Sequence, residues 1–510
     1  MSHINRSVIN MISGSVGYVM PMLLNLIFTP IILKNLGSEA YGLQTLVNVI
    51  IGFLMVADMG LDIPVTKFIS EFKAKDDQDS INRLLNSTLQ IYLLLGIFGM
   101  MIIFSLSPWL VKNVFNIPES LHSEGLIVFL LAGVGFLGGV FAMWGKSVFN
   151  GLQRYDIANG ISIVSNLLST IIGIILIVAG FGVVTFVFVR IFFSTASGLA
   201  YVYFSRGLLP SFKIQWGIDS AIWLLLKAQI AYGFVLRISG ILFSRLDQTL
   251  IGAWIGIVAV GVYSIPYLIT SSLIALIASA IHFIFPMASA LYSTSKTEEL
   301  NSLFVKSSRF VAAVSSLLFV PLILFGDKFL ILWVGQEVGV QGGDVLILLA
   351  LATYSSCLCN IVINSYVSGI GKLNIYATWA ILRSIMMAVG CLIFIRSYGI
   401  IGAGISMLIT CLADYIYFGY VIKIFLRMEV LMVLKKAYSR PISLAVVMGS
   451  LFYFARPLSN NWTGLIFLCT SFIFLYVALG FFVGIFGEIE KRALGTVLGF
   501  FTGKFKIKNV

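Results

Sequence analysis

The sequence predicts an all-α integral membrane protein of about fourteen transmembrane helices, built as two parallel six-helix lobes with two extra C-terminal helices. Hydrophobic residues make up 59% of the 510 residues, only 11% are charged, and the mean hydropathy is +1.02, well outside the soluble range. Apolar stretches of about 20 residues follow one another almost without pause, and each can cross a hydrocarbon core roughly 30 Å thick. The second half of the chain also repeats the pattern of the first at a fixed spacing.

The apolar stretches are solid blocks, whereas a membrane barrel would show alternating segments of about ten residues, so helices are predicted. The first block lacks a convincing cleavage site, and we expect it to be a retained helix. The fourteen predicted spans are 8–33, 41–62, 85–106, 123–148, 157–179, 183–204, 227–250, 258–281, 303–326, 343–368, 374–395, 401–424, 438–455 and 463–487.

The loop charges predict the orientation. With a cytoplasmic N-terminus, 24 of the 33 lysines and arginines fall in inside segments, five fall outside, and four lie within spans. Because cytoplasmic loops carry the excess of positive charge, both termini are predicted to face the cytoplasm. The net charge of +12 comes mostly from these loops, where lysine and arginine contact anionic membrane lipids. We therefore infer no nucleic-acid binding from it.

An internal repeat predicts the architecture. A shift of 219 places "LGSEAYG" (36–42) over "IGIVAVG" (255–261), and 8 of 53 positions between residues 36 and 88 are identical. A shift of 218 places "FNGLQR" (149–154) over "VSGIGK" (367–372). Six crossings return the chain to its starting side, so the lobes are parallel copies and the cleft between them is the expected substrate site. The predicted divisions are an N-lobe (1–210), a C-lobe (211–430), and helices 13 and 14 with a cytoplasmic tail (431–510).

Charged residues within the spans are the candidate site. Arg237, Arg245 and Asp247 interrupt the seventh span, and under the repeat they correspond to apolar or aromatic residues, so a role in building the lobe would not explain them. Arg237 and Arg383 are expected near the midplane of the bilayer, and Arg190 is expected below its outer edge. At these depths an unpaired charge costs about 2.5 to 3.5 kcal/mol or more. These arginines predict a wet, cationic interior. For Arg237, Arg383 and Arg190 a structural role stays an alternative, and Arg245 lies where snorkelling to the interface is cheap.

Four carboxylates are candidates for ion coupling: Asp414, Asp58, Asp247 and Asp62. Asp58 and Asp62 lie four residues apart, on one helical face near the inner end of span 2, and they form a salt bridge with Lys67, cap the loop, or form a cation site. Asp414 either carries a proton or sodium ion or partners a buried arginine. The sequence points to no catalytic residue and no metal centre, because its three histidines are scattered and its five cysteines lie within spans without a Cys-x-x-Cys pair.

Several segments together resemble the polysaccharide transporter family. They are "LGSEAYGL" (36–43), "DMGLDIPVTKFISEF" (58–72), "FNGLQRYDIANGI" (149–161) and "SRLDQTLIGAWIGIVAVGVYSI" (244–265). That family contains the O-antigen-type lipid-linked oligosaccharide flippases of the multidrug, oligosaccharidyl-lipid and polysaccharide exporter superfamily. The resemblance implies a protein of the bacterial inner membrane that moves an undecaprenyl-pyrophosphate-linked glycan to the periplasmic leaflet by alternating access.

Under this resemblance Arg237, Arg383, Arg190 and Arg245 are the expected substrate-binding residues, since guanidinium groups match phosphate oxygens. No cofactor is expected, and a proton or sodium gradient is the candidate driving force. The expected partners are the lipid-linked glycan, membrane lipids and a polysaccharide polymerase with its chain-length machinery. Two alternatives stay open: a cation-coupled multidrug or small-molecule exporter of the same superfamily, and, more remotely, a membrane glycosyltransferase or polymerase.

Overall fold

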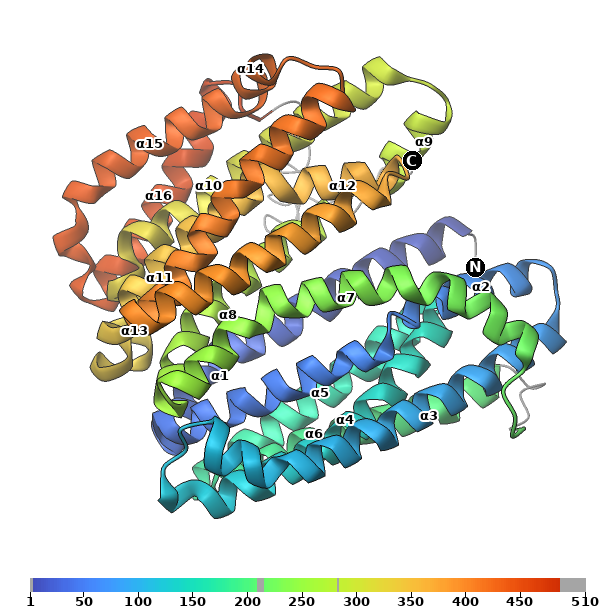
Figure 1. Cartoon of the computed structure of the whole chain (residues 1–510). Coiled ribbons are helices and arrows are strands. Elements are labelled where there is room, and N and C mark those ends of the chain that lie inside the picture. The colour runs from blue at the N-terminus through green and yellow to red at the C-terminus, as the bar shows by residue number, and fades with distance from the viewer. Residues whose placement is uncertain (1–2, 209–214, 282–283, 487–510) are drawn as a thin grey trace. The chain divides into compact units, whose positions relative to one another are not determined.

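The chain folds almost entirely into helices, and no strand occurs among the residues that the structure describes. A computed structural model describes residues 3–208, 215–281 and 284–486 (Figure 1). The helices are α1 (His3–Leu54), η1 (Met55–Asp58), α2 (Asp62–Ala74), α3 (Gln78–Trp109), η2 (Leu110–Val114), η3 (Glu119–Leu121), α4 (His122–Gly151), α5 (Tyr155–Val178), α6 (Val183–Leu208), α7 (Ser220–Trp254), α8 (Ile257–Ala280), α9 (Ile284–Ser293), α10 (Thr297–Val334), α11 (Gln336–Ser356), η4 (Cys357–Ile361), α12 (Val362–Gly369), α13 (Leu373–Ile424), α14 (Val430–Val433), η5 (Leu434–Tyr438), α15 (Ser439–Phe454), η6 (Arg456–Asn460) and α16 (Trp462–Phe482).

The predicted membrane spans coincide with these helices, which confirms the all-α membrane fold. Every predicted span falls on one to three of them, and nine helices in the described part of the chain are long and apolar enough to cross a membrane. Two helices hold two predicted spans each: α1 and α13 are both 52 residues long, and their backbones break at Gly37 (φ 81°) and Gly399 (φ 60°). Glycine tolerates this left-handed conformation, which lets the chain reverse without a long loop. The predicted tail after residue 486 lies outside the described residues.

The internal repeat reappears in the backbone. Under the shift of 219, the break at Gly37 recurs as the positive-φ turn at Gly256, and the positive-φ residue Asp76 recurs as Ser295. The same shift relates the start of α3 at Gln78 to the start of α10 at Thr297. The second predicted shift, 218, relates the starts of α5 and α13. These shared landmarks confirm two copies of one helical pattern although few residues are identical, whereas the lobe boundaries at 210 and 430 stay a prediction.

The chain forms two compact units. The first comprises residues 1–276 and 377–410, and the second residues 277–376 and 411–510. In the first unit α3, α4 and α6 pack side by side (Figure 1), around buried residues that include Tyr92, Phe136 and Trp144. Because Gly138 and Gly145 have no Cβ, α6 approaches α4 closely: a Cβ on Gly145 would collide with the Tyr201 side chain. The second unit packs α10 against α11 and α15.

The amphipathic helix α2 closes the C-terminal end of α4. Thr66 donates a hydrogen bond to the Ser147 carbonyl (3.2 Å), Ser70 to that of Gly151 (2.8 Å), and Lys73 to that of Leu152 (3.1 Å). The last carbonyls of a helix lack partners within the helix and carry partial negative charge, so two hydroxyls and an ammonium group suit them. This contact fixes α2 and thereby the turn before it, which carries Asp58 and Asp62.

The segment that precedes α7 is bound to α3 by side-chain hydrogen bonds. Asn86 accepts a hydrogen bond from the Gln215 amide (2.8 Å), and Gln90 accepts one from the Gly217 amide (2.8 Å) while it donates to the Gln215 carbonyl (2.8 Å). Asp219 then caps the N-terminus of α7 by accepting hydrogen bonds from the amides of Ala221 and Ile222. The start of α7 is therefore attached to the first half of the chain.

Replacing Gln90 by alanine should release this segment without unfolding the unit. A neutral hydrogen bond contributes about 1 kcal/mol, so we expect the Gly217 amide to exchange its hydrogen roughly fivefold faster or more in Q90A. Hydrogen exchange followed by mass spectrometry of peptides covering 215–219 measures this. The variant N166A is a matched control, because the Asn166 side chain donates within its own helix, to the Ser162 carbonyl. Equal exchange in Q90A and the unsubstituted chain would show that the side chain does not hold the segment.

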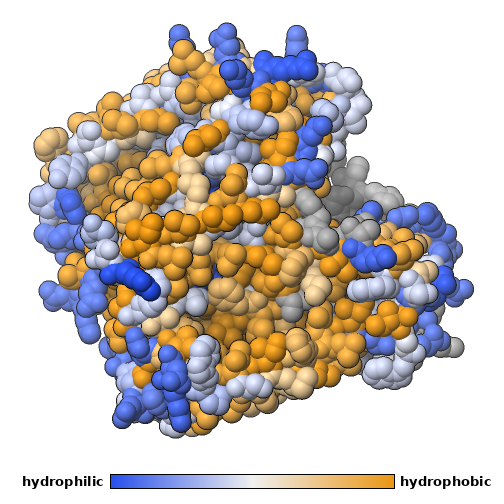
Figure 2. All heavy atoms as spheres, viewed as in Figure 1, coloured by the Kyte–Doolittle hydropathy of each residue, from blue (hydrophilic) through white to orange (hydrophobic). Residues whose placement is uncertain are grey.

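The surface of the molecule suits a lipid environment. Apolar residues predominate over the visible helices and hydrophilic ones gather toward helix ends (Figure 2). Large apolar side chains are exposed on helices of both units, for example Phe98 of α3 (60% exposed), Phe192 of α6 (56%) and Phe474 of α16 (72%). Exposed apolar area of this kind would promote aggregation in water and is stable in a bilayer.

Candidate functional site

The centre of the candidate site is an ion-pair cluster. The Arg237 guanidinium of α7 donates a hydrogen bond to Asp58 Oδ2 (2.9 Å) and lies 3.3 Å from Asp62 Oδ1. The Asp58 side chain is fully buried, whereas those of Arg237 and Asp62 are 30% and 39% exposed. Tyr92 of α3, also fully buried, lies beside Asp58. With all three charged groups ionised, the cluster has a net charge of −1.

Local sequence explains how the carboxylates come to face α7. Helix α1 passes into the short 3-10 helix η1, and the chain then turns through two left-handed residues, Met59 (φ 52°) and Gly60 (φ 70°). A Cβ on Gly60 would lie 2.9 Å from Gly233 of α7, so only a glycine lets the turn approach this closely. Asp58 and Asp62 stand on either side of the turn and reach the same guanidinium group.

The partners of Arg237 could not be found by looking along its own helix. The absence of an acid three or four positions away in α7 suggested a guanidinium free for substrate, but both partner carboxylates come from a different part of the chain, at the end of η1 and the start of α2. The structure thus brings Arg237, Asp58 and Asp62 together. Both acids form their salt bridge with this arginine, where the sequence suggested a neighbouring lysine.

A second arginine is held beside α7 by an aromatic ring. The Arg383 guanidinium of α13 lies 3.9 Å from the centroid of the Phe243 ring. The next residue, Ser384, donates a hydrogen bond to the Ser239 carbonyl of α7 (2.7 Å) and ties the two helices together. An arginine stacked on a ring keeps its charge and its forked donors while its hydrocarbon stem is covered. Phe243 cannot be distinguished in the sequence from any other aromatic residue in a span.

Arg245 and Asp247 lie further along α7, and they differ strongly in their surroundings. Arg245 lies against Gly52 of α1, where a Cβ would be 3.4 Å from its Nε atom. Asp247 is fully buried and accepts hydrogen bonds from the Tyr263 hydroxyl of α8 (2.6 Å) and from the Gln248 amide (2.7 Å). In the described part of the chain, the buried Gln248 Oε1 atom next to it has no hydrogen-bond partner. Asp247 is therefore a carboxylate buried inside the protein.

The last two candidates do not join these groups. Arg190 of α6 lies 5.8 Å from the centroid of the Phe186 ring and near Tyr41 of α1. Asp414 of α13 is fully buried in the second unit. The structure thus gathers Arg237, Asp58 and Asp62 in one cluster. Arg245 and Asp247 lie further along α7, and Arg383 of α13 lies beside that helix.

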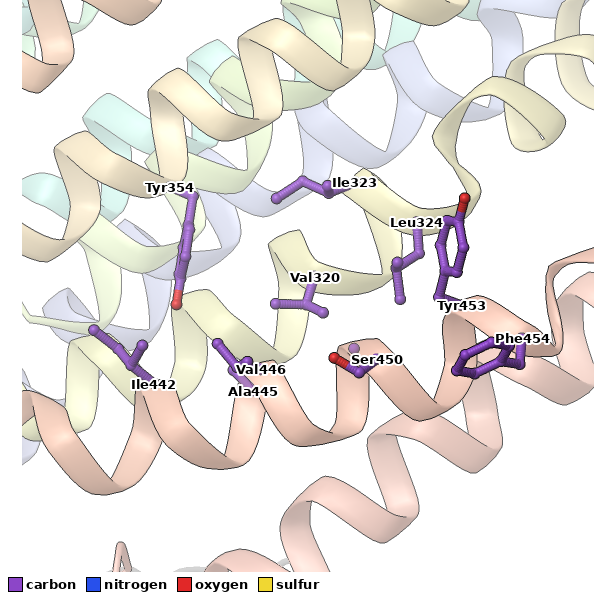
Figure 3. A pocket seen from close by; sticks show the side chains of 11 residues that line it. Val320, Ile323, Leu324, Tyr354, Ile442, Ala445, Val446, Ser450, Tyr453 and Phe454 are labelled. Atoms are coloured by element: carbon purple, nitrogen blue, oxygen red, sulfur yellow. The ribbon is translucent and has the colours of Figure 1, made fainter.

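The second unit holds a cavity of a different character. It has a volume of about 500 Å³ and lies between α10, α11 and α15, with mainly aliphatic and aromatic side chains around it (Figure 3). Tyr354 and Tyr453 present hydroxyl groups at its edge, and Ser450 is the other polar side chain on its wall. No charged side chain is among the described residues that line it, so it suits a hydrocarbon chain and does not suit a phosphate group.

Fold and site together define a multi-pass α-helical membrane protein with charged groups gathered within its helices. A family model described as "Polysaccharide biosynthesis protein" matches residues 34–337, more than half of the chain. The chain therefore belongs to this polysaccharide biosynthesis family.

One relative and two solved structures are similar to this chain. The uncharacterized membrane protein EpsK of Bacillus subtilis (strain 168) is 23% identical over 336 residues, which are 64% of this chain and 65% of EpsK. This chain thus spans slightly less than two thirds of the length of that relative. The lipid II flippase MurJ in an inward closed conformation has a TM-score of 0.70 at 11% identity, with 92% of this chain and 98% of MurJ covered. An inward-facing MATE family multidrug resistance transporter of the MOP superfamily has a TM-score of 0.64 at 17% identity, with 86% and 100% covered. At these identities the likeness shows a shared fold.

Proposed function

We propose that this protein is a flippase that moves an undecaprenyl-pyrophosphate-linked oligosaccharide from the cytoplasmic to the periplasmic leaflet of the bacterial inner membrane. The oligosaccharide would be a repeat unit of an O-antigen, capsule or exopolysaccharide. The polysaccharide biosynthesis family and the fold shared with MurJ support a lipid-linked glycan as cargo. The observation that carries the proposal is the Arg383 guanidinium stacked on Phe243 beside α7, the helix that also holds Arg237 and Arg245.

These groups suit a diphosphate head group. A lipid-linked sugar diphosphate cannot cross hydrocarbon unaccompanied, and an arginine in a water-poor surrounding offers forked donors to phosphate oxygens. Arg383 and Arg245 provide such donors, and Arg190 is the contribution of the N-lobe. Two carboxylates hold the Arg237 guanidinium until a phosphate displaces them or protonation of the acids weakens the contact.

This partner exchange would couple transport to an ion gradient. A proton or sodium ion that neutralises Asp58 or Asp62 weakens their hold on Arg237. Asp247 and Asp414, both fully buried, are further candidates for carrying the ion. The polyprenyl tail would stay in lipid, and the polymerase with its chain-length machinery would receive the glycan on the far side.

One observation favours a second function, a cation-coupled exporter of small molecules. The Arg237 cluster has two carboxylates for one guanidinium, and a negative cluster attracts a cationic cargo as well as a coupling ion. Export of cationic dyes that requires Asp58 would support this function.

Deletion of the gene tests the proposed cargo. We expect undecaprenyl-diphosphate-linked repeat units to accumulate on the cytoplasmic leaflet, with surface glycan lost and restored by the unsubstituted gene. Mass spectrometry of the extracted lipid, combined with leaflet-specific labelling of the sugar, identifies the units and their side. A deletion strain with normal surface glycan and no accumulated lipid-linked sugar would reject the proposal.

A further inference from the structure

Two helices cross through residues that the internal repeat makes equivalent. Gly42 of α1 corresponds to Gly261 of α8 under the shift of 219, and these two glycines lie against each other: a Cβ on either would be 3.3 Å from the backbone nitrogen of the other. Three positions further on, the hydroxyl oxygens of Thr45 and Ser264, which the same shift relates, lie 3.4 Å from each other. All four residues belong to the first compact unit.

The contact is reciprocal. A Cβ on Gly42 would collide with the Ile257 carbonyl oxygen, and a Cβ on Gly261 would lie 2.7 Å from that of Ser38, which is the repeat equivalent of Ile257. Two copies related by a two-fold axis touch through the same residues only where that axis runs between them. The crossing therefore marks the axis that relates the two predicted lobes, and here the two lobes meet backbone to backbone.

The crossing has a defined place along the chain. Both glycines follow the positive-φ turns at Gly37 and Gly256, which lie in predicted outside loops. A second contact extends it: Asn116, from the predicted outside loop between α3 and α4, donates from its backbone amide to the Gly252 carbonyl (3.3 Å) and from its side chain to the Ala253 carbonyl (3.4 Å). These contacts satisfy carbonyls at the C-terminal end of α7, where a helix leaves them without partners.

The ion-pair cluster lies past the other end of α1, where the end of η1 and the start of α2 meet α7. Sixteen positions separate Gly42 from Asp58, which is about 24 Å along a helix. At that end Gly60 meets Gly233, and Arg237 meets Asp58 and Asp62. The two lobes thus touch at an outer contact without charge and at an inner contact with charge.

We propose that the Gly42–Gly261 crossing, with Thr45, Ser264 and Asn116, is the outer closure of the transport path, which must separate before cargo leaves on the outer side. The inference rests on the proposed function, because only a transporter needs its outer end to open. Glycine at both positions lets the helices seal by backbone contact, and the weak hydroxyl contact beside it lets them separate without the cost of breaking an ion pair.

A reversible cross-link tests the closure. In T45C/S264C the two sulfur atoms replace hydroxyl oxygens 3.4 Å apart, so a disulfide should form under oxidation. We expect oxidised T45C/S264C to lose glycan translocation at least tenfold, reduction to restore it, and each single cysteine variant to translocate normally. Normal translocation by fully cross-linked protein, with the cross-link verified by mass spectrometry, would overturn the inference.

A distance measurement makes the test independent of the cargo. Spin labels at Lys34 and Ile255, both exposed residues beside the crossing, report its opening by pulsed electron paramagnetic resonance. We expect a longer distance in G261A than in the unsubstituted chain, whereas the control G240A should not change it, because a Cβ on Gly240 of α7 meets no atom within 4 Å. An unchanged distance in G261A overturns the closure whether or not the cargo is a glycan, while a longer distance with no glycan translocated in any variant supports the closure and rejects the proposed cargo.

Discussion

The variant R237A should fold less stably than the unsubstituted chain by roughly 3 kcal/mol, because removal of one member of a buried ion pair leaves the other as an uncompensated charge. Asp58, whose side chain is fully buried, is that remaining group. The loss should appear as a lower thermal unfolding midpoint and as less monodisperse protein after extraction in detergent. Cells that produce R237A should then display little or no surface glycan, partly because less of the variant protein is present.

A double variant separates stability from transport. Replacing Asp58 and Arg237 together, in D58N/R237Q, removes the buried carboxylate along with its partner and leaves a polar side chain at each position, so we expect it to recover most of the unfolding midpoint that R237A loses. Its translocation should stay low, because the cluster no longer holds a guanidinium that can exchange its carboxylates for a phosphate. The control K296A breaks the exposed pair of Lys296 with Glu299 and should cost about 0.5 kcal/mol or less. If R237A were as stable as the unsubstituted chain, the ion pair would not be structural and Arg237 would be available to cargo at all times.

Replacement of Arg383 by alanine should reduce glycan translocation roughly 10- to 100-fold at normal protein abundance. This range corresponds to the loss of one hydrogen bond to a charged group, about 1.5 to 3 kcal/mol. R383K should recover only part of the activity, since an ammonium keeps the charge but lacks the planar fork that pairs with phosphate oxygens and stacks on Phe243. Translocation per molecule, measured in vesicles with protein amounts matched, checks both variants.

Arg396 provides a matched control for Arg383. It belongs to the same helix α13 and the same unit, and its guanidinium also stacks on an aromatic ring, that of Trp254, at 4.6 Å. It lies at the predicted outer end of its span, away from the ion-pair cluster. We expect R396A to transport at close to the normal rate. Equal losses in R383A and R396A would show that stacking maintains the fold and that neither arginine meets cargo.

Much of the fold could be predicted from the sequence because it depends on patterns repeated over many residues. Each span needs only about 20 apolar residues, and substitutions within it preserve that signal. The repeat was visible through glycines such as Gly37, Gly42 and Gly261, where the backbone turns or approaches another helix and a side chain would not fit. Gly42 and Gly261, which the repeat makes equivalent, prove to contact each other.

The candidate site was less accessible to sequence reasoning because its contacts join distant segments. Helix periodicity relates Arg237 only to neighbours within its own helix, while Asp58 and Asp62 reach it from a turn in another span. The spacing of Asp58 and Asp62 predicts that these two carboxylates share a face, but no local pattern indicates that they meet Arg237. Likewise, Tyr263 became a partner of Asp247 only through the packing of α8 on α7.

The most direct test of the proposed transport is translocation by the purified full-length protein in sealed vesicles. A polyprenyl-diphosphate-linked oligosaccharide is placed in one leaflet, and its appearance in the other is followed by a sugar-modifying enzyme that cannot cross the membrane. We predict that the unsubstituted protein moves this lipid and that R383A moves it at least tenfold more slowly, with R396A unaffected. No movement of the lipid, together with Asp58-dependent export of a cationic dye from the same vesicles, would contradict a lipid-linked glycan as cargo.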